Sequence, residues 1–268
     1  MELTNENYFS TENNMKYMSA SQFKDFQKCE VEALAKANGT LVQEKTPALL
    51  FGGYVDACFS NELEQFKLDN PDMFLKTGEL KATYKNVEEV IKAIETDELM
   101  MNYLNGQKQV VMVGEIAGVP FKIKVDALHE DKIVDQKIMS SIYERVWVED
   151  ENGRNVKTDF IAAYGYDIQG AIYQEIVRQN TGKKLPFILA VCTKEENPDK
   201  ALIEIDQEYL DNALEIVKRY APDYDLIKKG LVAPKGCGHC SSCRKDKKVS
   251  YVISYKDLFN KGELEPNE

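Results

Sequence analysis

Long apolar runs are missing from this sequence. No stretch of about 18 consecutive apolar residues occurs, which argues against a membrane-spanning helix. The N-terminus also has no basic region followed by an apolar core, so a signal peptide is not indicated. We therefore expect a cytoplasmic protein without a membrane partner. Internal repeats and low-complexity tracts are absent too, and a 43% apolar content in 268 residues is enough for a substantial core.

The sequence also lacks an excess of positive charge, since its net charge is −11. Affinity for nucleic acid is dominated by lysine and arginine contacts to phosphate, so this charge argues against broad, nonspecific binding of nucleic acid. Basic residues do gather at 181–184, 228–229 and 235–248. A localised basic track beside an acidic site would be sufficient for a specific interaction.

Two short segments that mix apolar and charged residues, 121–126 and 132–137, are predicted to form adjacent strands of a hairpin. The first ends in Asp126, and the second contains Asp135 and Lys137, which share one face because strand side chains alternate. Two carboxylates and an amine are typical of metal-assisted phosphodiester cleavage. A solvent-exposed hairpin is the alternative. The apolar Ile133 and Val134 favour a site, because a carboxylate delivered from the interior needs compensation.

Three cysteines lie close together in the sequence, at Cys237, Cys240 and Cys243. In a cytoplasmic protein, this density indicates a metal site rather than disulfides. Zinc needs a fourth ligand, which His239 or Cys29 could supply. A [4Fe-4S] cluster needs four cysteines, and the spacing is similar to that of ferredoxins. The remaining cysteines, at positions 58 and 192, have apolar neighbours and are expected to pack as core residues.

Hydrophobic periodicity predicts an α/β fold, in which a mixed central sheet is flanked by helices. Helices are expected at residues 19–37, 47–63, 87–104, 160–180 and 209–229. Strands are expected at residues 109–113, 121–126, 132–137, 186–192 and 201–205, and residues 140–159 are expected to be irregular.

Several of these motifs together resemble the PD-(D/E)XK nuclease superfamily, in its RecB-type branch. They are Asp126, the Asp135-Gln136-Lys137 run and the Gln169-x-x-x-Tyr173 pair on the following helix. The chain is most similar to phage-encoded proteins of the exodeoxyribonuclease VIII type, and the likeness runs from about residue 17 to residue 244. It implies a restriction-endonuclease-like core. The catalytic residues that it implies are Asp126, Asp135, Lys137, Gln169 and Tyr173.

The resemblance also implies cofactors. Mg²⁺ or Mn²⁺ would be held by Asp126, Asp135, the Gln136 carbonyl and Asp56, which stands where relatives carry a metal-binding histidine. Related AddB-like and CRISPR-associated nucleases join an N-terminal cysteine to a C-terminal cysteine triplet around iron-sulfur. By that likeness Cys29 is the fourth ligand, and we favour a [4Fe-4S] cluster over zinc.

By resemblance, the expected activity is hydrolysis of DNA from duplex ends. This hydrolysis would serve phage-type recombination alongside a single-strand annealing recombinase. The protein would be located in the cytoplasm of a bacterial host or be encoded by a prophage, and it could form a homo-oligomer. Two alternatives are a catalytically silent nucleic-acid-binding or scaffold protein on the same fold and an RNA-binding module organised by a zinc knuckle.

The expected domain organisation has four parts along the chain. Residues 1–16 form a flexible N-terminus, and residues 17–235 form the nuclease domain. Residues 236–248 form a cysteine-rich metal segment that packs back on the N-terminal helix, and residues 249–268 form a C-terminal tail.

Overall fold

The computed structural model describes residues 3–42, 44–149, 154–245 and 247–257. Its centre is a five-stranded sheet in the order β1-β2-β3-β6-β7. The strands are β1 (Gln107–Ile116), β2 (Val119–Leu128), β3 (Ile133–Met139), β6 (Phe187–Thr193) and β7 (Lys200–Glu204). The β3 and β6 strands are parallel, and the other neighbours are antiparallel. The prediction of a mixed central sheet is therefore confirmed.

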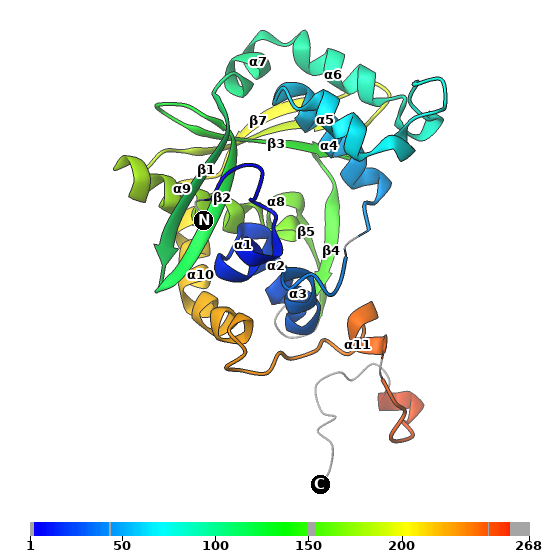
Figure 1. The fold of residues 1–268 in the computed structure, drawn as a ribbon, viewed down its shortest axis with the longest axis vertical. Helices are drawn as coiled ribbons and strands as arrows, with labels where there is room; N and C mark the ends of the chain where they lie inside the picture. The colour runs from blue at the N-terminus through cyan, green and yellow to red at the C-terminus, as the bar shows by residue number, and fades with distance from the viewer. Residues whose placement is uncertain (1–2, 43, 150–153, 246, 258–268) are drawn as a thin grey trace.

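Helices cover both faces of this sheet, because its strands are apolar on both sides (Figure 1). One core contains apolar residues of α2 (Ala20–Lys28), α9 (Tyr166–Thr181) and α10 (Gln207–Lys228). The other contains residues of α4 (Pro47–Phe59), α6 (Val87–Glu95) and α7 (Glu98–Leu104). Along β3, Ile133 belongs to the first core and Val134 to the second. Alternation therefore directs Asp135 and Lys137 toward the face covered by α9.

Shorter elements complete the chain. They are α1 (Thr11–Lys16), α3 (Glu30–Ala37), α5 (Leu63–Asp69), α8 (Phe160–Tyr164), α11 (Ser241–Lys245) and three single-turn helices at Pro71–Met73, Ala82–Tyr84 and Tyr255–Asp257. The segment expected to be irregular contains a separate hairpin of β4 (Arg145–Glu149) and β5 (Asn155–Asp159), packed against α8. Within the described residues, none of the helices is both long and apolar enough to cross a bilayer.

Three of the predicted long helices are each broken into two. The break in residues 160–180 falls at Gly165, whose φ of 62° lies in the left-handed region that ends helices. The break in residues 87–104 falls at Asp97, whose carboxylate accepts the Met100 N–H and starts a new helix. The third falls at Cys29, which is extended between α2 and α3. Periodicity did not reveal these breaks, because each new helix continues on the same side of the core.

The N-terminus differs from the expected flexible segment. Residues 11–16 form α1, which Ser10 caps, and both Tyr8 and Asn13 are buried. The physical reason is Lys122 of β2, which is only 1% exposed and donates to the carbonyl of Tyr8 and to Asn14. A buried ammonium requires acceptors, and this segment provides them. Residues 1–2 lie outside the described residues, and so do residues 258–268 of the expected C-terminal tail.

Candidate active site and cysteine centre

An open groove of about 1370 Å³ collects the predicted catalytic residues from separate elements. Its lining includes Asp56 of α4, Asp126 of β2, Asp135 and Lys137 of β3, and Gln169 of α9. Residues far apart in the sequence therefore meet at one end of the sheet, where β2 and β3 separate. The sequence prediction that these side chains converge agrees with this geometry.

Asp135 is the most constrained acid in the groove. Its side chain is 2% exposed, and its Oδ1 accepts a hydrogen bond of 2.6 Å from the Gln169 side-chain nitrogen. Its Oδ2 forms an ion pair with the Lys137 ammonium, which also lies 5.3 Å from the centre of the Tyr166 ring. A buried carboxylate is costly unless it is paired. Gln169 and Lys137 therefore fix both its charge and its direction.

Asp126 is held by the backbone of the neighbouring strand. The β2 and β3 strands pair only at Ala127 with Val134 and at Leu128 with Ile133, so they diverge before Gln136. The backbone N–H of Gln136 therefore does not pair with the backbone of β2, and it donates instead to Asp126 Oδ2 at 2.9 Å. The bond places Asp126 across the gap from Asp135. Ligation through the Gln136 carbonyl stays a prediction.

Asp56 is joined to the sheet by a residue that the sequence analysis did not single out. The Gln109 side-chain nitrogen lies 3.4 Å from Asp56 Oδ1, and Gln109 is 5% exposed directly before the apolar residues 110–113 of β1. Within the described part of the chain, Gln109 Oε1 and Gln136 Nε2 are buried without a hydrogen-bond partner. Buried orphan groups at one place indicate a ligand or water site. The available signal in the sequence was a glutamine directly before the four apolar residues 110–113.

The electrostatics of the groove favour a bound cation. Burial raises the pKa of Asp126 well above its ordinary value, and the charges of Asp135 and Asp56 raise it further. Burial likewise raises the pKa of Asp56, although Lys124 and Lys137 oppose this effect. Burial lowers the pKa of Lys137, but the attraction of Asp135 and Asp126 outweighs it, so the net shift is upward and the amine stays charged. Concentrated negative charge of this kind is relieved by a cation.

The oxygen donors fit a hard divalent ion such as Mg²⁺, which is usually held by one or two carboxylates together with waters and phosphate oxygens. Among the described residues, the carboxylates do not form a group of three whose oxygens all lie within 4.8 Å of one another. The groove therefore fits an ion that keeps open coordination positions, and it does not fit a closed cage made only of protein ligands.

Tyr173 has a different position from that of the acids. Its O–H donates to the Lys124 carbonyl at 3.0 Å, and its ring packs edge-on against Phe187 with 5.9 Å between centroids. The hydrogen bond fixes the backbone of β2 two residues before Asp126, and the ring contact anchors Tyr173 on β6. The structure thus joins Tyr173 to the site through the strand, and direct participation in the chemistry stays a prediction.

Basic residues of the groove differ from those suggested by the sequence clusters. Lys24, Lys124 and Lys137 line the groove, whereas Lys228 is buried elsewhere and donates to the carbonyl of Tyr17. Lys184 pairs with Asp211 on the surface. Sequence proximity did not reveal the basic side of the groove, because its three lysines come from α2, β2 and β3. The lining also includes acidic residues at positions 62, 64 and 69.

Four cysteines form a second centre on the far end of α2. The ligand atoms of Cys29, Cys237, Cys240 and Cys243 all lie within 4.8 Å of one another. Cys29 Sγ lies 3.5 Å from Cys243 Sγ and 3.7 Å from Cys240 Sγ. His239 lines the adjacent cavity but is not part of this group. Of the two candidates for a fourth ligand, the structure therefore brings in Cys29.

The backbone around these cysteines is shaped for converging sulfurs. The N–H groups of Cys240 and Cys243 donate to the sulfurs of Cys237 and Cys240 at 3.2 and 3.4 Å. Although burial raises the pKa of Cys237, N–H donors including those of His239 and Cys240 lower it to about 6. A Cβ on Gly236 would lie 2.8 Å from Cys243 Sγ, so only glycine fits there. The donor set is that of a thiolate-bound metal.

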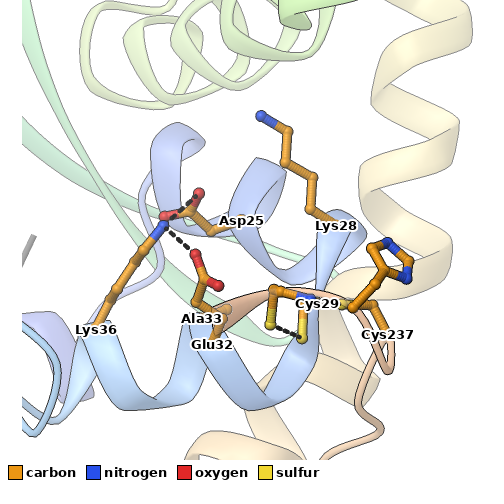
Figure 2. A pocket seen from close by; sticks show the side chains of 9 residues that line it. Asp25, Lys28, Cys29, Glu32, Ala33, Lys36 and Cys237 are labelled. Carbon is orange, nitrogen blue, oxygen red and sulfur yellow. Dashed lines mark hydrogen bonds and ion pairs between the residues drawn. The ribbon is translucent and has the colours of Figure 1, made fainter. Parts of the chain in front are cut away.

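A cavity of about 390 Å³ lies beside this centre. Figure 2 shows Lys36 directed toward Asp25 and Glu32, which also line this cavity. The Lys36 ammonium lies 3.4 Å from the Asp25 carboxylate and 3.2 Å from that of Glu32. The Lys36–Asp25 pair joins α3 to α2 across the break at Cys29, and the Lys36–Glu32 pair lies within α3. The Lys36–Asp25 pair therefore holds the two helices in the arrangement that presents the Cys29 thiol.

Comparisons with known proteins agree with this geometry. Residues 19–246 match the family described as a PDDEXK-like domain of unknown function (DUF3799). The crystal structure of a protein named "Putative exonuclease" from Eubacterium rectale is similar, with 47% sequence identity and a TM-score of 0.89. The match covers 96% of this chain and 98% of that chain. Among curated proteins there is no significant match.

The family match spans most of the chain, and the similar structure carries the name of an exonuclease, so together they support a nuclease. The predicted superfamily and the predicted restriction-endonuclease-like core are therefore confirmed. This chain belongs to the family of PDDEXK-like domains.

Proposed function

We propose that this protein is a Mg²⁺- or Mn²⁺-dependent deoxyribonuclease that hydrolyses phosphodiester bonds from DNA ends. The observation that carries the proposal is Asp135, fixed between Gln169 and Lys137 and facing Asp126 across the divergence of β2 and β3. This arrangement gathers buried carboxylates and a charged amine in an open groove, as phosphodiester hydrolysis requires.

The residues have separate roles in this proposal. Asp126, Asp135 and Asp56 would hold the ion together with the Gln136 carbonyl, and a bound divalent ion would supply an acidified water and neutralise phosphate charge. Lys137 is protonated because its pKa is raised, so it acts as a fixed positive charge on the phosphate rather than as a base. Gln169 is a positioning residue for Asp135, and Tyr173 is one for the β2 backbone.

The test is digestion of linear and circular DNA with and without Mg²⁺. We expect Mg²⁺-dependent loss of linear DNA only, and Lys137→Ala should lower the rate by about 100-fold or more. Lys132→Ala is a matched control, because Lys132 lies just before β3 and pairs with Asp131 outside the groove. DNA binding without cleavage in any divalent metal would contradict the proposal and favour a silent scaffold.

We propose further that the cysteine centre holds one zinc ion with a structural role. Four thiolates bonded to one zinc at about 2.3 Å lie about 3.8 Å apart at tetrahedral corners, and the sulfur distances here are 3.5, 3.7 and 4.0 Å. A [4Fe-4S] cluster places iron and sulfide between its thiolates and therefore separates them more widely. The sulfur spacing thus supports zinc over the iron-sulfur cluster favoured by resemblance.

Metal analysis of protein purified without oxygen separates these two cofactors. Zinc at one equivalent and a colourless solution are expected, while iron, sulfide and visible absorbance would establish the cluster instead. The biological setting that we propose is phage-type recombination with a single-strand annealing partner. Co-purification of such a protein from the host, and the protein's mass in solution, test the partner and a homo-oligomer.

A further inference from the structure

The N-terminal segment forms one wall of the catalytic groove. Asn5, Glu6, Tyr8 and Phe9 line the same groove as the acids. Phe9 stands out among them, because its side chain is 71% exposed although its neighbour Tyr8 is 6% exposed. A phenylalanine that is so exposed beside a polar site buries little surface in the free protein. Its position is therefore better explained by a contact with the substrate than by folding.

Phe9 is supported rather than loose. Asn14 donates to the Phe9 carbonyl at 3.0 Å, and the Tyr8 ring lies edge-on to the Phe9 ring with 4.9 Å between centroids. The buried Lys122 ammonium donates to the Tyr8 carbonyl and to Asn14. These contacts fix the backbone on both sides of Phe9. A ring presented in this way loses little conformational entropy when a ligand stacks on it.

The ring also lies next to positive charge at the catalytic site. The Lys124 ammonium is 5.7 Å from the Phe9 centroid, and Lys124 precedes Asp126 by two residues on β2. Lys124 and Asp56 also line the same groove. An aromatic face beside a cation is the combination by which proteins hold an unpaired nucleotide, with the base on the ring and the phosphate at the amine.

We propose that Phe9 is a stacking platform for an unpaired nucleobase next to the scissile phosphate, with Lys124 at the adjoining phosphate. This inference rests on the proposed nuclease function and adds a substrate preference. The enzyme acts on a strand end with at least one base free of its partner, so frayed or overhanging ends are cleaved faster than tightly paired ends.

The first experiment compares Phe9→Ala with the parent on oligonucleotides with unpaired ends. Stacking on one base contributes about 10-fold in affinity, so kcat/KM should fall by about that factor. Replacing the stacked nucleotide by an abasic one should slow the parent by the same factor and leave Phe9→Ala unchanged. Tyr209→Ala is the control, because Tyr209 is 61% exposed on α10 and does not line the groove.

The second experiment measures stacking without cleavage. Trp147 is the single tryptophan of the chain, so Phe9→Trp in a Trp147→Phe, Asp135→Asn background carries one reporter. Its fluorescence should be quenched by an overhanging oligonucleotide and much less by the abasic version. Cleavage by the parent together with an unquenched reporter and an unaffected Phe9→Ala would overturn the inference alone. Absence of cleavage by the parent would instead overturn the proposed function.

Discussion

The groove and the cysteine centre each gather side chains that could hold a metal, but the protein holds them in opposite ways. In the groove, Asp135 is buried between a core helix and a core strand. At the cysteine centre, α11 has no buried residue, and the sulfur ligands come from the helix break at Cys29, from the loop that carries Cys237 and Cys240, and from α11 at Cys243. From this difference we expect the fold alone to form the groove, whereas order around Cys237 to Cys243 should depend on a bound metal.

The largest expected effect is the loss of DNA cleavage when an acid of the groove is replaced, while the fold is kept. Asp126→Asn should lower cleavage by about 1,000-fold, because it removes a ligand charge. Its melting temperature should stay equal or rise, because asparagine relieves repulsion with Asp135 and Asp56 and can still accept the Gln136 N–H. Calorimetry measures the melting temperature, and a digestion assay measures the cleavage rate. A variant that fails to fold would show that the groove is not independent of its charges.

The cysteine centre should show the opposite behaviour. Cys243→Ser should remove the metal and cost about 3 kcal/mol, because the metal closes a loop from Cys29 to the C-terminal segment. For a chain of this size that loss lowers the melting temperature by about 6–12 °C. Cys58→Ser, outside the group, should change it little. Equal melting temperatures for Cys243→Ser and the parent would contradict a structural metal.

Residues of both regions could be predicted from the sequence, but by different signals. Asp135 and Lys137 follow from strand alternation, and the cysteine triplet follows from spacing of two residues. Gln169 required the family likeness, because a glutamine on a helix has no signal of its own. These residues belong to local sequence patterns or to a known motif, so they could be identified as candidate site residues before the structure.

Phe9, Lys24, Lys124 and Gln109 were missed because each reaches the groove from a different segment. Their contacts depend on tertiary packing, such as the Tyr8 to Lys122 bond across 114 residues. The polar composition of residues 1–16 indicated a flexible segment, since a buried lysine that recruits acceptors cannot be recognised from sequence. The order of helices and strands in the core was predictable from the sequence, but the residues that form the walls of the groove were not.

A smaller effect tests α2, the helix that connects the two regions. Lys228 holds the start of α2 by donating to Tyr17 and Gln22, and burial lowers the pKa of Lys228 to about 7, although Asp225 opposes the shift. Between about pH 7 and 10 the unfolded chain therefore binds more protons than the folded protein. Stability should rise with pH in that window, by up to about 1.4 kcal/mol per unit.

Urea unfolding at pH 7.5 and 9 measures this slope, and Lys228→Met should reduce it. The nearby Lys122, whose pKa burial lowers to about 8, should leave a residual slope of the same sign in that variant. A slope that is identical in the parent and in Lys228→Met would show that Lys228 keeps its proton in the fold. The attachment of α2 to α10 would then not depend on pH.

The smallest effect separates positioning from chemistry inside the groove. Tyr173→Phe removes only the bond to the Lys124 carbonyl, so it should cost about 1 kcal/mol of stability. If Tyr173 acts through the β2 backbone, cleavage should fall only a few-fold, and the pH profile of kcat should keep its shape. A fall as large as that of Lys137→Ala would place the Tyr173 hydroxyl in the reaction itself. Comparison of the two variants therefore decides whether the groove uses Tyr173 as support or as a catalytic residue.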